Sequence, residues 1–198
     1  KGMFADVEIE LSSLSRGEGI HFEESIKGGA IPKEFFSAIE TGIREAAEYG
    51  VLAGFPTVDL KVRLLDGSFH EVDSNEMAFK IAASMAFKNA AMKAKPIVLE
   101  PMMSVEVVTP EEFMGDVIGD LNSRRGQVQG MAARAGAQVI EALVPLKEMF
   151  GYSTDVRSKT QGRASYSMQF SHFDPVPQNV GKEIVSQAMG RDVEYGNY

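Results

Sequence analysis

Histidine, serine and aspartate lie close together in one polar segment of the chain. The segment is Asp66-Gly67-Ser68-Phe69-His70-Glu71-Val72-Asp73, between an alternating strand pattern and a helical pattern. His70 with Asp66 or Asp73 has the residue types of an acid–base pair for proton transfer. The histidine, serine and phenylalanine are equally suited to hydrogen-bond to and stack on exposed RNA bases. A plain connector uses the same residues, so the spacing leaves all three interpretations open.

Basic side chains gather in one stretch of an otherwise acidic chain. The 198 residues carry 20 Lys and Arg against 28 Asp and Glu, a net charge of −8, which argues against nucleic-acid binding through bulk charge. Residues 121–163 reverse this balance, with seven basic side chains and three acidic ones. Because a planar guanidinium suits phosphate recognition, this stretch is either a phosphate-contacting surface or a solvated surface with ordinary ion pairs.

The familiar catalytic and nucleotide-binding motifs are missing from the sequence. It contains no GxxxxGK[ST] phosphate loop, no N-K-x-D guanine motif, no H-E-x-x-H and no G-x-S-x-G. Asp116-Val117-Ile118-Gly119 matches D-x-x-G, but it lies within a strongly periodic helical pattern. The chain has no cysteine, and its three histidines are far apart. We therefore predict no catalytic residue, no metal site and no bound cofactor in these residues.

The elements that position the polar segment follow from hydrophobic spacing. In the first part of the chain we expect two strands, at 5–11 and 20–27, and then a helix at 32–50. A strand at 57–65 and a helix at 74–94 follow. Asp73 and Glu76 have the spacing of a capping box at the start of the last helix. That helix is apolar on most sides, which predicts burial on more than one face.

A second unit begins after Lys95-Pro96, where proline ends the helix. We expect a strand at 103–107, a helix at 110–121, and two strands at 127–133 and 137–144. A helical stretch at 145–156 and a strand at 164–170 follow. Thr109 and Glu112 have capping-box spacing, and residues 157–163 form a cationic loop. The order βαββαβ is the ferredoxin-like arrangement, with two helices on one face of an antiparallel sheet. A terminal helix at about 178–189 and a loose tail complete an α+β chain of two domains.

Several long runs of residues are distinctive beyond these patterns. Those in the first unit lie at 28–34, 51–56, 66–74 and 76–80, and those in the second lie at 107–112, 114–126, 149–152 and 157–163. Through these runs the sequence resembles the C-terminal part of bacterial elongation factor G, the translational GTPase that drives ribosomal translocation. The resemblance extends to about residue 185 and so covers almost the whole chain.

The resemblance implies a domain organisation. Residues 1–95 would be the family's fourth domain, a ribosomal-protein-S5-domain-2-like ββαβα unit with a left-handed crossover. Residues 97–180 would be its ferredoxin-like fifth domain, and residues 181–198 the end of the C-terminal helix and a tail. The GTPase domain, with its GTP and Mg²⁺, would lie upstream. This fragment itself is therefore expected to be no enzyme and to hold no cofactor.

The resemblance also implies where the chain works. Residues 66–74, which we call the tip loop, would enter the ribosomal decoding site as tRNA and mRNA move, with His70 as the residue of greatest interest. The implied contact residues in the first unit are Asp66, Gly67, Ser68, Phe69, His70, Glu71, Asp73 and Ser74, with Lys1 and Gly2 from a neighbouring loop. In the second unit, contacts to large-subunit rRNA are expected from Arg124, Arg125, Arg157, Lys159 and Arg163. A cytoplasmic monomer with no membrane contact is expected.

Three other functions stay open at this stage. A divergent paralogue acting in ribosome recycling would share the same domains. A stand-alone enzyme would use His70 with Asp66 or Asp73 and would need an enclosed pocket around them. A small-molecule-binding regulator would need a ligand cleft within the ferredoxin-like unit.

Overall fold

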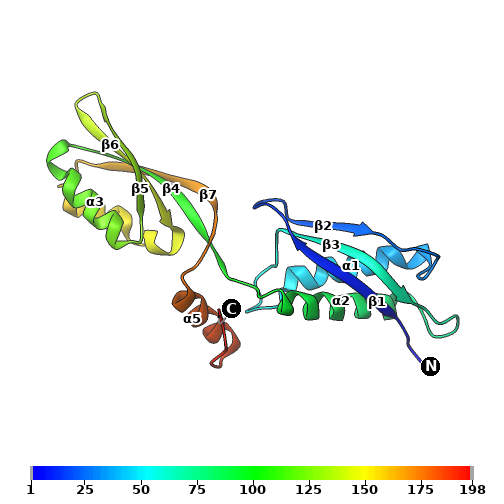
Figure 1. Cartoon of the computed structure of the whole chain (residues 1–198). Helices are drawn as coiled ribbons and strands as arrows, with labels where there is room; N and C mark the ends of the chain where they lie inside the picture. The colour runs from blue at the N-terminus through cyan, green and yellow to red at the C-terminus, as the bar shows by residue number, and fades with distance from the viewer. Residues whose placement is uncertain (1, 197–198) are drawn as a thin grey trace. The chain divides into compact units, whose positions relative to one another are not determined.

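The computed structural model describes residues 2–196, which divide into two compact units (Figure 1). Unit 1 contains the chain up to Ile97 and again from Pro177 onward, and unit 2 is Val98–Val176. One sheet has three strands and the other has four, so the chain is an α+β protein, as the sequence predicts. Across residues 2–196, no helix is long and apolar enough to cross a membrane.

In unit 1, the central strand of the sheet leads into the tip loop. The strands are β1 (Asp6–Ser13), β2 (Ile20–Glu24) and β3 (Leu60–Ser68), in the order β1-β3-β2. β3 is antiparallel to β1 and parallel to β2, and the parallel connection runs through η1 (Lys33–Phe35) and α1 (Phe36–Tyr49). α2 (Glu76–Lys93) follows β3, which confirms the predicted order ββαβα.

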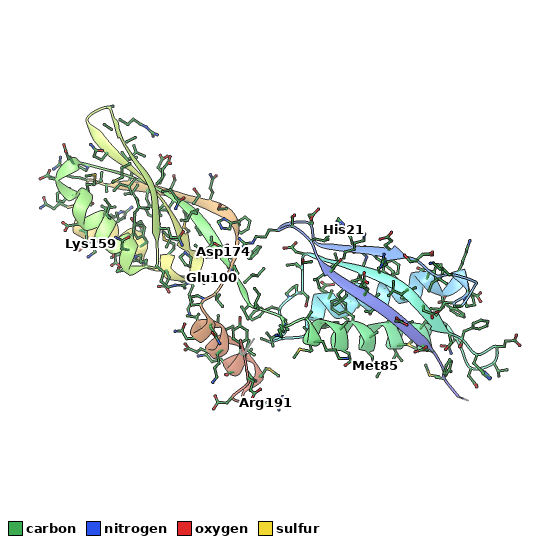
Figure 2. All side chains as sticks on the ribbon, in the orientation of Figure 1. His21, Met85, Glu100, Lys159, Asp174 and Arg191 are labelled. Carbon is green, nitrogen blue, oxygen red and sulfur yellow. The ribbon has the colours of Figure 1, made fainter. Side chains whose placement is uncertain are left out.

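Both helices of unit 1 cover the same face of its sheet (Figure 1). The core between them is built from α1, β3 and α2, through Ile39, Ile43, Val62, Leu64, Phe79 and Phe87. The opposite side of α2 is exposed in this chain at Met77, Ile81, Met85 and Met92, and Figure 2 shows Met85 on the side away from the sheet. The predicted burial of α2 on more than one face therefore holds where it contacts the sheet and α1, and fails along this one exposed stripe.

β3 extends three residues beyond the strand expected from the sequence. Asp66, Gly67 and Ser68 pair with Glu8, Val7 and Asp6 of β1. A β-bulge between Glu8 and Ile9 shifts the register there. Cross-strand pairing thus overrides the low strand propensity of Asp and Gly, and the beginning of the tip loop is strand rather than loop.

Both predicted capping boxes are wrong. The α2 N-cap is Asn75, whose Oδ1 accepts from the Ala78 amide at 2.8 Å, so the helix begins after Asp73. The Thr109 hydroxyl donates to the Pro110 carbonyl at 3.2 Å instead of capping a helix. The Asp73 carboxylate faces the His70 imidazole instead, whereas Thr109 binds local backbone, which short polar side chains do readily.

Unit 2 has the predicted ferredoxin-like fold. Its strands are β4 (Leu99–Thr109), β5 (Gln127–Arg134), β6 (Ala137–Pro145) and β7 (Ser165–Pro175), all antiparallel in the order β5-β6-β4-β7. The helices are η2 (Glu111–Phe113), α3 (Met114–Ser123), η3 (Leu146–Met149) and α4 (Tyr152–Lys159). α3 and α4 pack on one face of the sheet through Val117, Leu121, Tyr152 and Val156, against Val105, Val107 and Ile140.

The helical stretch after Pro145 is interrupted where the sequence predicts continuity. η3 ends at Met149, and Gly151 takes a left-handed conformation with φ 77° before α4 begins. α4 then continues through Arg157 and Lys159, which the sequence places in a loop. Cations in the last turn of a helix interact favourably with its carbonyl end, and this explains why the basic run ends the helix.

The C-terminal helix α5 (Gln178–Met189) lies where the sequence predicts it. It ends at Gly190, with φ 66°. The residues after it are not loose as far as the structure describes them, because Tyr195 is buried and Gln178 Nε2 donates to the Gly196 carbonyl at 2.6 Å. The helix therefore holds part of the tail that was expected to be free.

Candidate functional site

A serine at the end of the tip loop holds the loop closed. The Ser74 hydroxyl accepts from the His70 amide at 2.8 Å and donates to the Phe4 carbonyl at 2.7 Å. The Ser74 amide donates to the His70 carbonyl at 3.0 Å. Ser74 thus links both backbone groups of His70 to the segment before β1, and these bonds brace the loop.

Asp73 connects the same segments from the other side. Its carbonyl accepts from the Phe4 amide at 2.9 Å, and its Oδ2 lies 3.3 Å from Nδ1 of His70. A Cβ placed on Gly2 would lie 3.1 Å from the Asp73 carboxylate, so the segment before β1 runs directly beside the loop. Lys1, predicted to act with Gly2, lies outside the described residues.

At the β3 end of the tip loop, Gly67 and Ser68 contact β1. Gly67 lies so close to β1 that a Cβ there would be 2.2 Å from the Asp6 carbonyl oxygen. The Ser68 hydroxyl donates to Asp6 Oδ2 at 3.4 Å. Gly67 therefore has a structural reason to be glycine, whereas Asp66 and Ser68 beside it are exposed.

The exposed part of the tip loop combines polar and apolar side chains. The His70 side chain is 59% exposed, Val72 is 74% exposed, and Phe69 is 40% exposed. Met3 and Phe4, from the segment braced against the loop, are also exposed. This surface offers an imidazole for hydrogen bonds and aromatic and aliphatic surface for stacking, which is the combination that unpaired nucleobases require.

The same exposure disfavours an acid–base enzyme at this place. The His70 and Asp73 side chains are 59% and 34% exposed, so solvent surrounds the pair. Catalytic pairs are usually found in clefts, where burial and neighbouring charges perturb their proton affinities. In residues 2–196, no group of three or more His, Cys, Asp and Glu side chains is arranged to hold a metal ion.

The five cations predicted to contact rRNA fall into two groups. Arg124 is buried, and its side chain donates hydrogen bonds within unit 2 to Asp120, Glu148, Phe150 and Asp155. Arg125 binds Glu100, which is itself buried, and lies 3.9 Å from Glu148. For these two arginines an RNA contact stays a prediction, and the structure gives each of them internal carboxylate partners.

The other three cations are accessible. Arg157 and Lys159 are exposed in the last turn of α4, and neither forms an ion pair with a described residue. Figure 2 shows Lys159 on the helical side of the sheet. Arg163 is exposed and pairs with Glu112, while its guanidinium lies 5.7 Å from the Phe113 ring centroid. Of the five predicted cations, Arg157 and Lys159 are therefore the two that are both exposed and without an ion pair to a described residue.

Some functional residues could not be recognised from the sequence. Phe4 was not singled out, because its contact with the tip loop joins positions about seventy residues apart. Asn75 does have a readable signal, since asparagine is a preferred N-cap residue and it directly precedes Glu76. The sequence contains no local sign that Ser74 binds two segments at once.

Comparison with known proteins agrees with this architecture. The family described as "Elongation factor G, domain IV" matches residues 1–95, and the family described as "Elongation factor G C-terminus" matches residues 97–184. A crystal structure of a protein from Thermus thermophilus is 41% identical and superposes with a TM-score of 0.86. That match covers 96% of this chain and 28% of the Thermus chain.

The two units are therefore a pair of translation elongation factor domains, a class that neither fold could have defined without these matches. The chain belongs to the elongation factor G family, and it carries domain IV followed by the C-terminal domain. It spans about 28% of the length of the Thermus protein that it matches.

Proposed function

We propose that these domains form the ribosome-contacting part of a GTP-dependent elongation factor that promotes movement of tRNA and mRNA. In this proposal the tip loop enters the decoding region of the small subunit, and α4 contacts large-subunit rRNA. GTP and Mg²⁺ act in another part of the full-length factor, which works as a monomer in the cytoplasm. Family membership supports the general role, and the geometry of the tip loop supports the specific one.

The observation that carries the proposal is a loop that is both braced and exposed. Ser74 and Asp73 tie it to the segment before β1 through hydrogen bonds to Phe4 and His70. His70 nevertheless projects into solvent. A loop fixed before binding loses little conformational entropy when it meets RNA, and this suits an element that must hold a moving substrate in place.

The experiment is His70→Ala in the full-length factor. We expect the rate of tRNA–mRNA translocation to fall about tenfold or more, because a directional contact to RNA is lost. Ribosome-stimulated GTP hydrolysis should stay near normal, since it depends on another part of the factor. Rapid-mixing measurements of both rates on the same ribosomes separate the two effects.

His21→Ala is the matched control. His21 is an exposed histidine of the same unit, on β2, and it pairs in register with Lys61 at the opposite end of β3 from the tip loop (Figure 2). This variant should translocate normally. Equal translocation rates for His70→Ala and the unmodified factor would show that His70 does not act in translocation.

A further inference from the structure

Arg124 joins three separate segments of unit 2. Its Nε donates to Asp120 Oδ2 at 3.0 Å, within α3. Its Nη1 donates to the Glu148 and Phe150 carbonyls at 2.6 and 3.2 Å, at the break between η3 and α4, and its Nη2 donates to the Asp155 carboxylate of α4. We call this set of bonds the Arg124 clasp.

The clasp matters because it holds the first turn of α4 in addition to the contacts of that helix with the core. α4 is an eight-residue helix whose N-cap is Gly151, a residue with no side chain that could cap the helix. Tyr152 and Val156 anchor its inner face in the core. The Arg124 guanidinium also lies 5.0 Å from the Tyr152 ring centroid, so the clasp holds the first turn of α4 by both stacking and hydrogen bonds.

The position of α4 decides where two exposed cations point. Arg157 and Lys159 follow Asp155 by two and four residues on the same short helix. A small rotation of α4 about its axis would therefore move both charged groups away from fixed phosphates. Isolated helices of this length are marginal in water, so the tertiary contacts of α4 set its orientation.

We propose that Arg124 is a positioning residue, which fixes α4 through Asp155 so that Arg157 and Lys159 meet rRNA phosphates. This inference rests on the proposed contact between α4 and rRNA, and it reverses the expectation that Arg124 itself touches RNA. The guanidinium is buried, and the Asp120 and Asp155 carboxylates lie beside it to balance its charge. It has neither the exposure nor the free charge of a phosphate contact.

Asp155 provides a test, because the two explanations predict opposite changes in ribosome affinity when its side chain is removed. Its side chain is 51% exposed, so its removal makes the surface beside Arg157 less negative. If charge alone governed binding, Asp155→Ala would bind ribosomes more tightly. If the clasp positions α4, the same variant binds more weakly, because the helix loses its bond to Arg124.

The experiment measures ribosome affinity of the full-length factor at one fixed salt concentration. We expect Asp155→Ala and Arg124→Lys each to weaken binding by about tenfold, since lysine keeps the charge but cannot form the forked set of bonds. The matched control is Asp116→Ala, an exposed acid of α3 with no ion pair to a described residue. It should bind as the unmodified factor or slightly more tightly.

A second pair of variants separates this inference from the proposed function. In an Arg157→Ala/Lys159→Ala background, Asp155→Ala should cause no further loss, because the positioned cations are already gone. If that background binds normally, the proposed RNA contact of α4 is wrong. If it binds weakly while Asp155→Ala behaves like Asp116→Ala, the RNA contact stands and the positioning role is wrong.

Hydrogen exchange keeps the inference testable even where a variant is less stable. Asp155→Ala and Arg124→Lys should speed amide exchange in residues 155–160 while the sheet amides of β4 and β6 stay protected. Unchanged exchange in α4 would contradict the clasp. Loss of protection throughout unit 2 would also contradict it, because Arg124 would then act on the whole fold rather than on α4.

Discussion

At the scale of single residues, Ser74 and Arg124 each join segments that are far apart in sequence. Ser74 binds His70 and Phe4, and Arg124 binds α3, the residues before α4, and α4 itself. Both were predicted as RNA contacts from residue type and family resemblance. The structure shows what each one holds, since a buried or bridging polar group stabilises a fold mainly when all its bonds are satisfied.

Tyr152 allows a prediction about pH. Burial raises the pKa of Tyr152 above its ordinary value of about 10. Above that pH an unfolded chain releases the phenolic proton while the folded chain keeps it, so the free energy of unfolding falls as pH rises. Tyr152→Phe should remove this part of the alkaline loss, as measured by urea unfolding midpoints between about pH 9 and 11.

At neutral pH the same variant should be as stable as the original or slightly more so. The Tyr152 hydroxyl is buried without a hydrogen-bond partner among residues 2–196, so its removal leaves no group unpaired. Tyr49→Phe is the control, because Tyr49 is 78% exposed. An alkaline loss of equal size in Tyr152→Phe and the unmodified chain would refute the explanation.

At the scale of elements, the close approach of α1 and α2 depends on a glycine. A Cβ on Gly42 would lie 2.4 Å from the Lys80 carbonyl oxygen of α2. Real side chains do not approach backbone so closely, so any larger residue must push the helices apart. Because both helices share the core with β3, this displacement would disturb the base on which the tip loop is built.

Gly42→Ala should destabilise unit 1 by about 1–3 kcal/mol through overpacking. Gly115→Ala should have the opposite sign, because Gly115 lies in α3 with open space around the added Cβ. There alanine gains up to about 1 kcal/mol of helix propensity. Thermal unfolding of both variants checks the pair, and stabilisation by Gly42→Ala would show that the helices separate without cost.

Element types were predictable where hydrophobic spacing was strong, and their ends were not. The alternation at 60–64 and the helical spacing through Ile39 and Ile43 both identify their elements correctly. The end of β3 at Ser68 was missed because β1 supplies its hydrogen bonds from sixty residues away. The start of α2 was missed because Asp73 is engaged with Phe4 and His70 instead of the helix.

At the scale of the whole molecule, an acidic chain carries a local concentration of cations. The net charge is −8, yet Arg157 and Lys159 project from α4 without carboxylate partners among the described residues. The proposed RNA contact therefore depends on local positive potential, while the acidic remainder repels polyanions elsewhere. We expect this balance to limit indiscriminate binding to RNA.

Neutralising surface acids should weaken that discrimination. Changing Glu24, Glu34 and Glu48, which are exposed and form no ion pair with a described residue, to Gln would raise the net charge by three. Affinity for an unrelated RNA, measured by filter binding at low salt, should increase several-fold. The same positions changed to Asp provide the charge-matched control, and equal affinities for both sets would contradict the prediction.

The sequence by itself determined the order of strands and helices, the two-domain organisation expected from it, and the family. It did so because side-chain periodicity and long residue runs are local properties of the chain. Tertiary structure decided which polar residues are available. Arg124 and Arg157 are the same residue type in the same basic stretch, but one is enclosed by four hydrogen bonds and the other is exposed. Availability depends on contacts between distant segments, and these form only when the chain folds.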